Sequence, residues 1–389
     1  METYTIMHND IPVADIPTID GYCVGITKIH NAEHIIPGSM RSGTGKLDIS
    51  NFCWTWNNRQ IPLARQNLDV IQFATKTKSP GRIAMQANFA NLSDHYWAKP
   101  AGSDLQYRDI NFYHNAFSAQ AGIVLIAPEI QKFPQIQDMA NPGCCTNGNM
   151  PKSWALDSTG TPRLYKTGMS VFEQEPTNEK LASILNRLIS APHVDYDTTI
   201  VEGRLCSACT CATSETLEFI PAYSIIQDTG IQDWHMSAKN PLTEYHNFAE
   251  KHEVEDITPS LTAMIITDYI MRNTDRHWNN FGLLRNPKTL KYFKAMPLFD
   301  YGDSLYHNMD LTNITPSKNA RSRLTNETLF EDLQYLKPYD IQSINIANLI
   351  KFPDHAGEIL ATTYMTQERR DKILNSIRYR VNDILDYFA

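Results

Sequence analysis

Three polar residues, Asp275, Asn280 and Asp300, stand close together in the segment 268–302. Asn280 follows Asp275 by five positions, and Asp300 opens an Asp-Tyr-Gly tripeptide after a short insert. The apolar run before them, residues 260–273, has the pattern of a buried helix and would deliver this segment from a hydrophobic core. The fold must therefore bring two short oxygen ligands on one loop together with a third at the end of a strand.

Protein kinases use this spacing for phosphoryl transfer. By the same chemistry, Asp275 would orient the acceptor hydroxyl and accept its proton, and Asn280 and Asp300 would hold magnesium ions on the phosphates of ATP. The alternative is a surface loop that happens to be rich in Asn and Asp. Three ligand positions at matching intervals behind an apolar helix favour the kinase interpretation.

The same residues carry a family resemblance. The segments NTDRHWNNFG (273–282) and MPLFDYGDSL (296–305) resemble the HipA-like serine/threonine kinases of bacteria. The resemblance implies an α+β, bilobal protein-kinase-like fold with a small β-rich nucleotide lobe, a helical C-terminal lobe and an N-terminal α/β extension. It also implies ATP and Mg²⁺ as cofactors, Asp275 as the catalytic residue, and Asn280 and Asp300 as metal ligands.

Two N-terminal segments extend the resemblance over most of the chain. Residues 54–74 and 93–118 are similar to segments of the larger HipA-like proteins found in many Gram-positive bacteria. Their many aromatic residues are typical of packing, which we favour over a ligand site. A cluster of Pro, Gly and Asn near 139–149 predicts a boundary. We therefore expect an N-terminal extension (1–140), a kinase N-lobe (141–228) and a helical C-lobe (229–389).

The nucleotide half of a kinase site needs a strand lysine and a helix glutamate. Residues 153–168 predict a hairpin around Asp-Ser-Thr-Gly, and Lys166 ends its second strand within reach of the α- and β-phosphates. Residues 175–190 predict a helix with Glu179 in its first turn, where it could pair with Lys166. The element Q-E-P-T-N-E (174–179) resembles one that follows the strand lysine in the HipA-like family.

The segment CCTNGNMPKSW (144–154) is the predicted phosphate loop. Thr146, Asn147, Gly148 and Ser153 are its candidate ligands, because Gly148 permits close backbone approach and backbone N–H groups can cradle phosphate oxygens. Some HipA-type kinases phosphorylate a serine of this loop in themselves. The resemblance makes Thr146 and Ser153 candidates for such self-modification.

Adenine is expected at a hinge. Residues 217–226 predict a strand whose backbone around Ile220, Ala222 and Tyr223 would bond to the adenine edge, with apolar neighbours beside the ring. An ordinary edge strand that ends in proline fits this segment as well.

The net charge and the lengths of the apolar runs limit which binding partners and which cellular compartment we expect. The chain has 389 residues and a net charge of −8, so no overall field attracts nucleic acid or an anionic membrane. The N-terminus lacks a basic and an apolar signal region, and the apolar runs at 121–127 and 263–271 are too short to span a bilayer. We therefore expect a cytoplasmic protein.

The seven cysteines do not indicate a disulfide framework. Cys206, Cys209 and Cys211 form C-x-x-C-x-C, which could bind zinc. The same segment also predicts a strand, in which cysteine acts as a small apolar residue, and we favour the strand.

Together these features predict an ATP- and Mg²⁺-dependent serine/threonine protein kinase. It could phosphorylate itself, and it could be the toxin of a toxin–antitoxin pair with a small helix-turn-helix antitoxin. The alternatives are a lipid or small-molecule kinase with the same site, since phosphoinositide kinases share a D-R-H-x-x-N element, and a nucleotide-binding regulatory module without turnover.

Overall fold

The computed structural model describes residues 1–41, 44–127, 136, 138–229, 240–336 and 340–389. These residues form both helices and strands, as predicted for an α+β protein. They separate into two units: unit 1 comprises Met1–Lys166, Thr213–His252 and Leu283–Phe293, and unit 2 comprises Thr167–Ala212, Glu253–Gly282 and Lys294–Ala389. The predicted segments 1–140, 141–228 and 229–389 do not coincide with these units. They stay a prediction about which parts of the chain carry nucleotide binding and catalysis.

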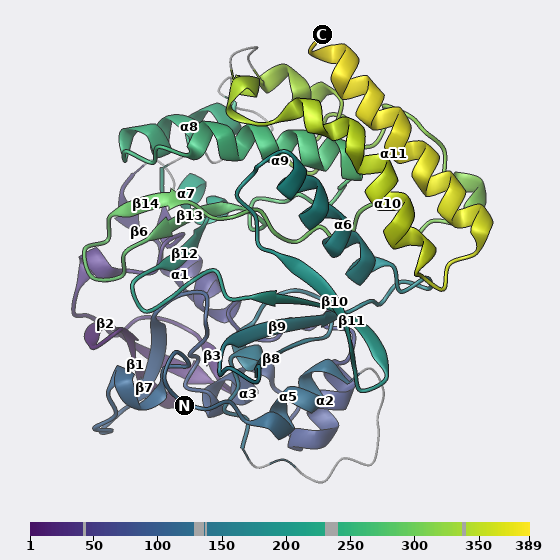
Figure 1. The fold of residues 1–389 in the computed structure, drawn as a ribbon. Coiled ribbons are helices and arrows are strands. Elements are labelled where there is room, and N and C mark those ends of the chain that lie inside the picture. The colour runs from purple at the N-terminus through teal and green to yellow at the C-terminus, as the bar shows by residue number, and fades with distance from the viewer. Residues whose placement is uncertain (42–43, 128–135, 137, 230–239, 337–339) are drawn as a thin grey trace. The chain divides into compact units, whose positions relative to one another are not determined.

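An antiparallel sheet opens unit 1, with strand order β3-β2-β1-β7 and with β4 beside β2 (Figure 1). The chain turns between β1 and β2 at Asn9, whose φ of 51° suits the left-handed region that asparagine tolerates. Ile6, Val13 and Ile16 have no exposed surface and form the buried side of this sheet. The strands are β1 (Glu2–His8), β2 (Ile11–Ile19), β3 (Tyr22–Cys23), β4 (Lys28–Ile29) and β7 (Tyr96–Pro100).

Short helices complete the first part of unit 1. Several begin at side chains that accept backbone N–H groups: the Asp48 carboxylate caps α1, Ser79 caps α3 and Ser118 caps α5. The elements are the strand pair β5 (Met40–Arg41) and β6 (Lys46–Leu47), and the helices α1 (Ile49–Asn57), α2 (Leu68–Thr75), α3 (Pro80–Gln86), α4 (Tyr107–Ile110) and α5 (Ala119–Ile126).

The predicted hairpin of residues 153–168 is present as β8 (Lys152–Leu156) and β9 (Pro162–Thr167). Its loop is organised by Asp157, whose carboxylate accepts the N–H groups of Thr159 and Thr161. Gly160, with φ +81°, occupies the position that requires a left-handed backbone. Turn residues in the sequence therefore located this hairpin correctly.

The predicted strand of residues 217–226 is wrong in its second half. Strand β12 (Glu218–Pro221) ends at the proline, and helix α7 (Ala222–Thr229) begins at the next residue. The apolar residues Ala222, Ile225 and Ile226 are buried at helical spacing, a pattern that a short apolar run shares with a strand. Strand β12 joins β13 (Gly282–Arg285) and β14 (Tyr292–Ala295) in a sheet of order β12-β13-β14, and α8 (Pro241–Lys251) follows α7.

A buried polar cluster lies in the core of unit 1. The Glu218 carboxylate, which is fully buried, accepts Arg285 at 2.7 Å and contacts His8 Nε2 at 3.0 Å and His95 Nδ1 at 3.5 Å. His8 Nδ1 in turn lies 2.7 Å from His34 Nδ1. Burial disfavours the ionised carboxyl, but the bonds from His8 and His95 and the charge of Arg285 hold the pKa of Glu218 well below its ordinary value. The cluster therefore contains an ionised pair in the buried core.

Unit 2 contains the longest helices of the described residues. Helix α11 (Gln367–Tyr387) packs against both α9 (Ile257–Met271) and α10 (Phe352–Ala361), and α6 (Glu175–Leu188) also packs against α9 (Figure 1). Nearly every residue of α9 is buried, as its largely apolar sequence predicts. The predicted helix at 175–190 is thus confirmed as α6, and helices α9, α10 and α11 lie in the segment 229–389 that was predicted to be helical. No helix in the described part of the chain is long and apolar enough to cross a bilayer.

The cysteine-rich segment is a strand, as favoured from the sequence. Strands β10 (Tyr196–Val201) and β11 (Arg204–Thr210) form an antiparallel hairpin around Glu202 and Gly203, whose φ values are 48° and 76°. Cys206 and Cys209 are buried and three positions apart on β11, so their side chains point to opposite faces. This spacing suits packing better than a shared metal.

We predict that Glu218→Gln lowers the free energy of unfolding by roughly 3–5 kcal/mol, because it leaves the Arg285 charge buried without its counter-ion. Urea titration would measure the change. Asp20→Asn, which breaks the exposed Arg82–Asp20 pair, serves as control and should cost less than about 1 kcal/mol. Equal midpoints for wild type and Glu218→Gln would contradict this account.

Candidate active site

The loop after α9 places Asp275 and Asn280. Helix α9 ends at Met271 and is capped by Arg272, which adopts a left-handed backbone with φ 49°. The Asn273 side chain then donates to Asp268 Oδ1 at 2.8 Å and accepts the N–H of Asp275 at 3.1 Å. Asn280 Nδ2 donates to the carbonyl of Asp275 at 3.3 Å, which closes the loop. The two predicted residues therefore belong to one hydrogen-bonded turn.

Arg276 ties this loop to the segment that carries Asp300. Its guanidinium is 1% exposed and forms an ion pair with Asp268 at 3.0 Å. It also donates to the carbonyl of Asn280 at 2.7 Å and to that of Phe299 at 2.8 Å. Although burial disfavours its charge, the Asp268 carboxylate keeps the pKa of Arg276 above its ordinary value. One side chain thus fixes the backbone beside both predicted metal ligands.

Asp300 itself sits in a strained conformation. Its φ of 64° lies in the left-handed region, which costs energy for a residue other than glycine. The next residue, Tyr301, donates its N–H to Glu179 Oε2 at 2.9 Å, and its ring lies under the Arg276 guanidinium at 4.5 Å. The loop is therefore held on both sides of the strained residue.

The element Q-E-P-T-N-E at the start of α6 has a clear structural role. Asn178 Nδ2 donates to the carbonyls of Gly302 and Ser304, both at 2.8 Å, and Gln174 Nε2 donates to that of Leu305 at 2.8 Å. An irregular loop lacks the regular backbone hydrogen bonds of a helix or sheet, and these side-chain amides donate to its carbonyl groups instead. The helix that carries Glu179 therefore shapes the segment after Asp300.

The carboxylate of Asp275 has two nitrogen-bearing neighbours, the Arg323 guanidinium and the His277 ring, and burial lowers the pKa of His277 below its ordinary value. Arg323 Nη1 bonds to Asp275 Oδ1, and His277 Nε2 lies 4.0 Å from Oδ2. The Asp275 side chain is 30% exposed, so it remains accessible to an acceptor. Arg323 lies 48 positions away in sequence with no motif around it, so only the fold could identify it.

The donor set around Asp275 fits a hard divalent cation. The Asn280 amide uses its nitrogen on the Asp275 carbonyl, which leaves its oxygen to act as a ligand. An amide oxygen and the Asp300 carboxylate are the ligand types that Mg²⁺ prefers. The residues present therefore suit the Mg²⁺ ion that the sequence resemblance implies.

A second acidic group lies on the segment after Asp300. Glu175, Asp303 and His307 place their ligand atoms within 4.8 Å of one another. The Glu175 carboxylate already accepts the N–H groups of Met169 and Ser170. His307 Nε2 lies 3.4 Å from Asp303 Oδ1. We treat these residues as polar surroundings of the site.

Burial and the negative charges of neighbouring carboxylates raise the pKa of Asp303. Burial, followed by the charges of four neighbouring carboxylates, raises the pKa of Asp303 to about 7; these neighbours are Asp275, Asp300, Glu175 and Glu179. Such repulsion is typical of sites that bind cations. The site is thus strongly acidic when no cation is bound.

The predicted nucleotide residues lie in unit 1. Lys166 is buried on β9, directly across from Lys152 on β8. In the predicted phosphate loop, Asn147 is exposed and Thr146 and Gly148 are half-buried. Ser153 is buried, and its hydroxyl donates to the Trp154 carbonyl at 3.3 Å.

The predicted hinge residues also belong to unit 1. Ile220 and Ala222 are buried, and the half-buried Tyr223 lies against Trp54, with ring centroids 5.5 Å apart. Because α7 begins at Ala222, the predicted strand backbone is available to adenine only up to Pro221. The adenine contact of Ala222 and Tyr223 therefore stays a prediction.

The structure connects one group of predicted residues by hydrogen bonds within unit 2. This group is Asp275, Asn280, Glu179 and the backbone next to Asp300. The predicted pairing of Lys166 with Glu179 stays a prediction, since these residues belong to different units.

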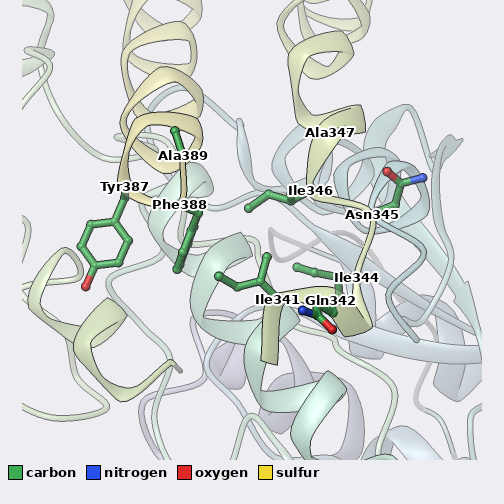
Figure 2. A pocket seen from close by; sticks show the side chains of 9 residues that line it. All are labelled: Ile341, Gln342, Ile344, Asn345, Ile346, Ala347, Tyr387, Phe388 and Ala389. Atoms are coloured by element: carbon green, nitrogen blue, oxygen red, sulfur yellow. The ribbon is translucent and has the colours of Figure 1, made fainter. Parts of the chain in front are cut away.

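One pocket of unit 2, of about 480 Å³, lies elsewhere (Figure 2). The end of α11 and the residues from Ile341 to Ala347 line it with mostly apolar side chains. It contains none of the predicted site residues.

Comparisons with known proteins identify the fold. No protein-family model matches the sequence, and no curated protein is detectably similar to it. Among solved structures, the chain resembles HipA of Shewanella oneidensis MR-1, part of a toxin–antitoxin system solved with HipB and operator DNA. The TM-score is 0.57 at 11% identity, over 98% of this chain and 96% of HipA. CtkA, a proinflammatory kinase of Helicobacter pylori, gives a TM-score of 0.46 at 17% identity, over 60% of this chain and 91% of CtkA.

The chain therefore has a kinase-like α+β fold. The particular fold is similar to that of HipA, with which the chain aligns over nearly its whole length. The fold class predicted from the sequence is confirmed by this comparison. The Gram-positive type of the resemblance stays a prediction.

We predict that Arg276→Lys lowers the free energy of unfolding by roughly 2–4 kcal/mol, because an ammonium cannot bond at once to Asp268 and to two carbonyls. Urea unfolding would measure this loss. Arg187→Lys, at an exposed ion pair of unit 2, should change stability by less than about 1 kcal/mol. The account fails if the two variants are equally stable.

We predict that Asp303→Asn stabilises the protein more at pH 8 than at pH 5. The folded-state pKa is raised from 3.8 to about 7, so the folded protein retains a proton that the unfolded chain has lost in this window. The contribution of Asp303 to stability therefore falls as the pH rises, and asparagine removes that loss. The side chain is 38% exposed, so solvent reduces the effect.

Urea midpoints of wild type and Asp303→Asn at the two pH values would test this prediction. Asp195→Asn, at an exposed carboxylate, is the matched control and should show no such pH dependence. A midpoint difference that is the same at both pH values would contradict the raised pKa.

Proposed function

We propose that this protein is an ATP- and Mg²⁺-dependent phosphotransferase whose acceptor is a serine or threonine hydroxyl of a protein. The observation that carries the proposal is the Arg276 side chain, which joins the loop of Asp275 and Asn280 to the segment of Asp300. A kinase needs these three residues at one place, and an ordinary surface loop has no need of a buried guanidinium to hold them. The HipA-like fold supports the same proposal.

The residues of unit 2 would divide the chemistry as follows. Asp275 would orient the acceptor hydroxyl and take its proton through the carboxylate oxygen that Arg323 does not occupy. Asn280 and Asp300 would hold Mg²⁺, which neutralises charge on the phosphates when bound. Glu179 would act as a positioning residue, because it holds the backbone of Tyr301 next to Asp300.

The residues of unit 1 would hold the nucleotide. Lys166 would bind the α- and β-phosphates, and the loop around Thr146, Asn147 and Gly148 would bind the phosphate oxygens. Ile220 and its neighbours would contact adenine. Ser153, which is buried, and Thr146, whose hydroxyl donates to the Pro142 carbonyl at 2.9 Å, would need to leave the loop's present conformation to become phosphorylated.

The biological setting is part of the proposal. HipA was solved with the antitoxin HipB and DNA, which supports a toxin–antitoxin role with a small helix-turn-helix partner for this chain, in the cytoplasm. A lipid or small-molecule kinase would use the same residues. A binding module without turnover would not need the carboxylate of Asp275.

We predict that Asp275→Asn reduces phosphoryl transfer by roughly a hundredfold or more, because the amide cannot accept the hydroxyl proton. Purified wild type and variant would be incubated with Mg²⁺ and γ-labelled ATP and then analysed by intact mass. Phosphopeptide mapping of the product would show whether Thr146 or Ser153 is modified. Asp371→Asn, at an exposed position on α11, should leave the rate unchanged.

The variant should keep its fold, because the Asp275 side chain is partly exposed and no buried bond depends on it. Unchanged transfer by Asp275→Asn would defeat the proposed role of this residue. Failure of the wild type to bind ATP in a thermal-shift titration would defeat the proposed function as a whole.

A further inference from the structure

Two cations of unit 1 hold the turn at residues 146–149 by its carbonyl groups. Arg65 donates from Nη2 to the Thr146 carbonyl at 2.6 Å and from Nε to the Gly148 carbonyl at 2.7 Å. Lys152 Nζ donates to the intervening carbonyl of Asn147 at 2.9 Å. The next carbonyl, that of Asn149, accepts the backbone N–H of Gln66 at 3.0 Å. Four successive carbonyl groups thus accept hydrogen bonds, either from Lys152 or from the residues Arg65 and Gln66 that precede α2.

This arrangement fixes where the N–H groups of the turn point. In a trans peptide the N–H lies opposite the carbonyl of the preceding residue. Because the carbonyls of Thr146, Asn147 and Gly148 are bound to Arg65 and Lys152, the following N–H groups point away from these cations. The N–H of Gly148 is accepted by the Asn147 side chain at 2.6 Å. Backbone N–H groups of a turn can bind an anion, and an anion at this turn would replace the Asn147 side-chain oxygen on the Gly148 N–H.

The charge of Arg65 favours an anion as well. Its side chain is 2% exposed, and in the described part of the chain it has no carboxylate partner and its Nη1 has no acceptor. Burial lowers the pKa of Arg65 to about 10, so the guanidinium is still charged at neutral pH. A buried charge without a counter-ion is costly. Because Arg65 binds the carbonyl side of the turn, its charge would act on an anion at the N–H side across the peptide groups and not by direct contact. Lys152 and Lys166, paired across β8 and β9, add positive charge to the same region.

We propose that residues 146–149 form a preformed polyphosphate-binding turn and that Arg65 is the positioning residue that fixes it. The inference deepens the proposed function and rests on it, because the polyphosphate would be that of ATP. It also gives a role to the first 140 residues. The Arg at the end of the segment W-N-N-R-Q-I-P-L-A-R would hold the nucleotide loop by its carbonyls.

Gly148 is the residue on which this turn depends most closely. Its φ is +100°, and a Cβ at this position would lie 2.3 Å from Lys152 Nζ. Any other residue would strain the backbone and displace the lysine from the Asn147 carbonyl. Gly148 is half-buried in a loop, so its replacement should alter the turn and leave the rest of unit 1 folded.

The test is a binding titration with three probes: inorganic tripolyphosphate, ATP and adenosine. We expect Arg65→Met to weaken the binding of tripolyphosphate and ATP by roughly tenfold or more. The binding of adenosine should be unchanged, because only the phosphates would contact the turn. Arg59→Met is the matched control. Arg59 belongs to the same segment and is also buried, but it bonds to Asp94 and to the carbonyls of Phe89 and Tyr96. Its loss should change phosphate affinity by less than about twofold.

Gly148→Ala provides a second variant in case Arg65→Met does not fold. This variant should weaken the binding of tripolyphosphate to a similar degree. Gly160→Ala is its control, because Gly160 also has a positive φ of +81° but has open space around it. Equal tripolyphosphate affinity for wild type and Gly148→Ala, or for wild type and a folded Arg65→Met, would overturn the proposal.

The outcomes separate this inference from the proposed function. A wild type that binds no tripolyphosphate overturns the polyphosphate turn, even if phosphoryl transfer is found. A wild type that binds tripolyphosphate, loses it in both variants and transfers no phosphate supports the turn and defeats the kinase function.

Discussion

The guanidinium of Arg276 determines the geometry of the candidate active site. It is buried with Asp268, and its remaining N–H groups reach the backbone of two segments that come from different parts of the chain. Replacing a buried ion pair by apolar residues often leaves stability unchanged or improves it, so stability alone does not explain such a pair. Here the pair specifies a geometry, because an apolar side chain could not hold the carbonyls of Asn280 and Phe299 at fixed positions.

The segment after Asp300 needs this support because its backbone is unfavourable. Asp300, Leu305 and Tyr306 all have positive φ values, which side chains other than glycine rarely adopt. Amides from α6 bind the carbonyls between them, and Arg369 on α11 binds the Tyr306 carbonyl at 2.8 Å. Side-chain bonds from two helices therefore maintain a conformation that the loop would not choose alone.

The sequence predicted the elements whose chemistry is local. The turn residues of the β8–β9 hairpin and the apolar pattern of α9 each predicted the correct element. The roles of Asp275 and Asn280 stay predictions. The fold class followed from the same motifs and from the family resemblance. These features could be predicted because the interactions that create them lie within a few residues of one another.

The remaining features depend on partners that are distant in sequence. Arginine usually lies on the protein surface, so nothing in the sequence indicates that Arg276 and Arg65 lie in the interior. Only the structure shows that both are buried and bind backbone carbonyl groups. Lys152 was overlooked for the same reason. Helix α7 was missed because its apolar residues fit a strand as well as a helix, and only the packing of Ile225 and Ile226 decides between them.

The Glu218–Arg285 ion pair has a consequence for synthesis of the chain. Glu218 and Arg285 both belong to unit 1, yet segments of unit 2 lie before and between them. The core that β1 begins thus stays incomplete on the ribosome until residue 285 has emerged, more than two hundred residues after its first strand. A nascent chain would carry the unpaired Glu218 and three nearby histidines for that interval, when chaperones are most needed. If translation stalled before residue 285 had emerged, unit 1 would therefore lack Arg285, the buried counter-ion of Glu218.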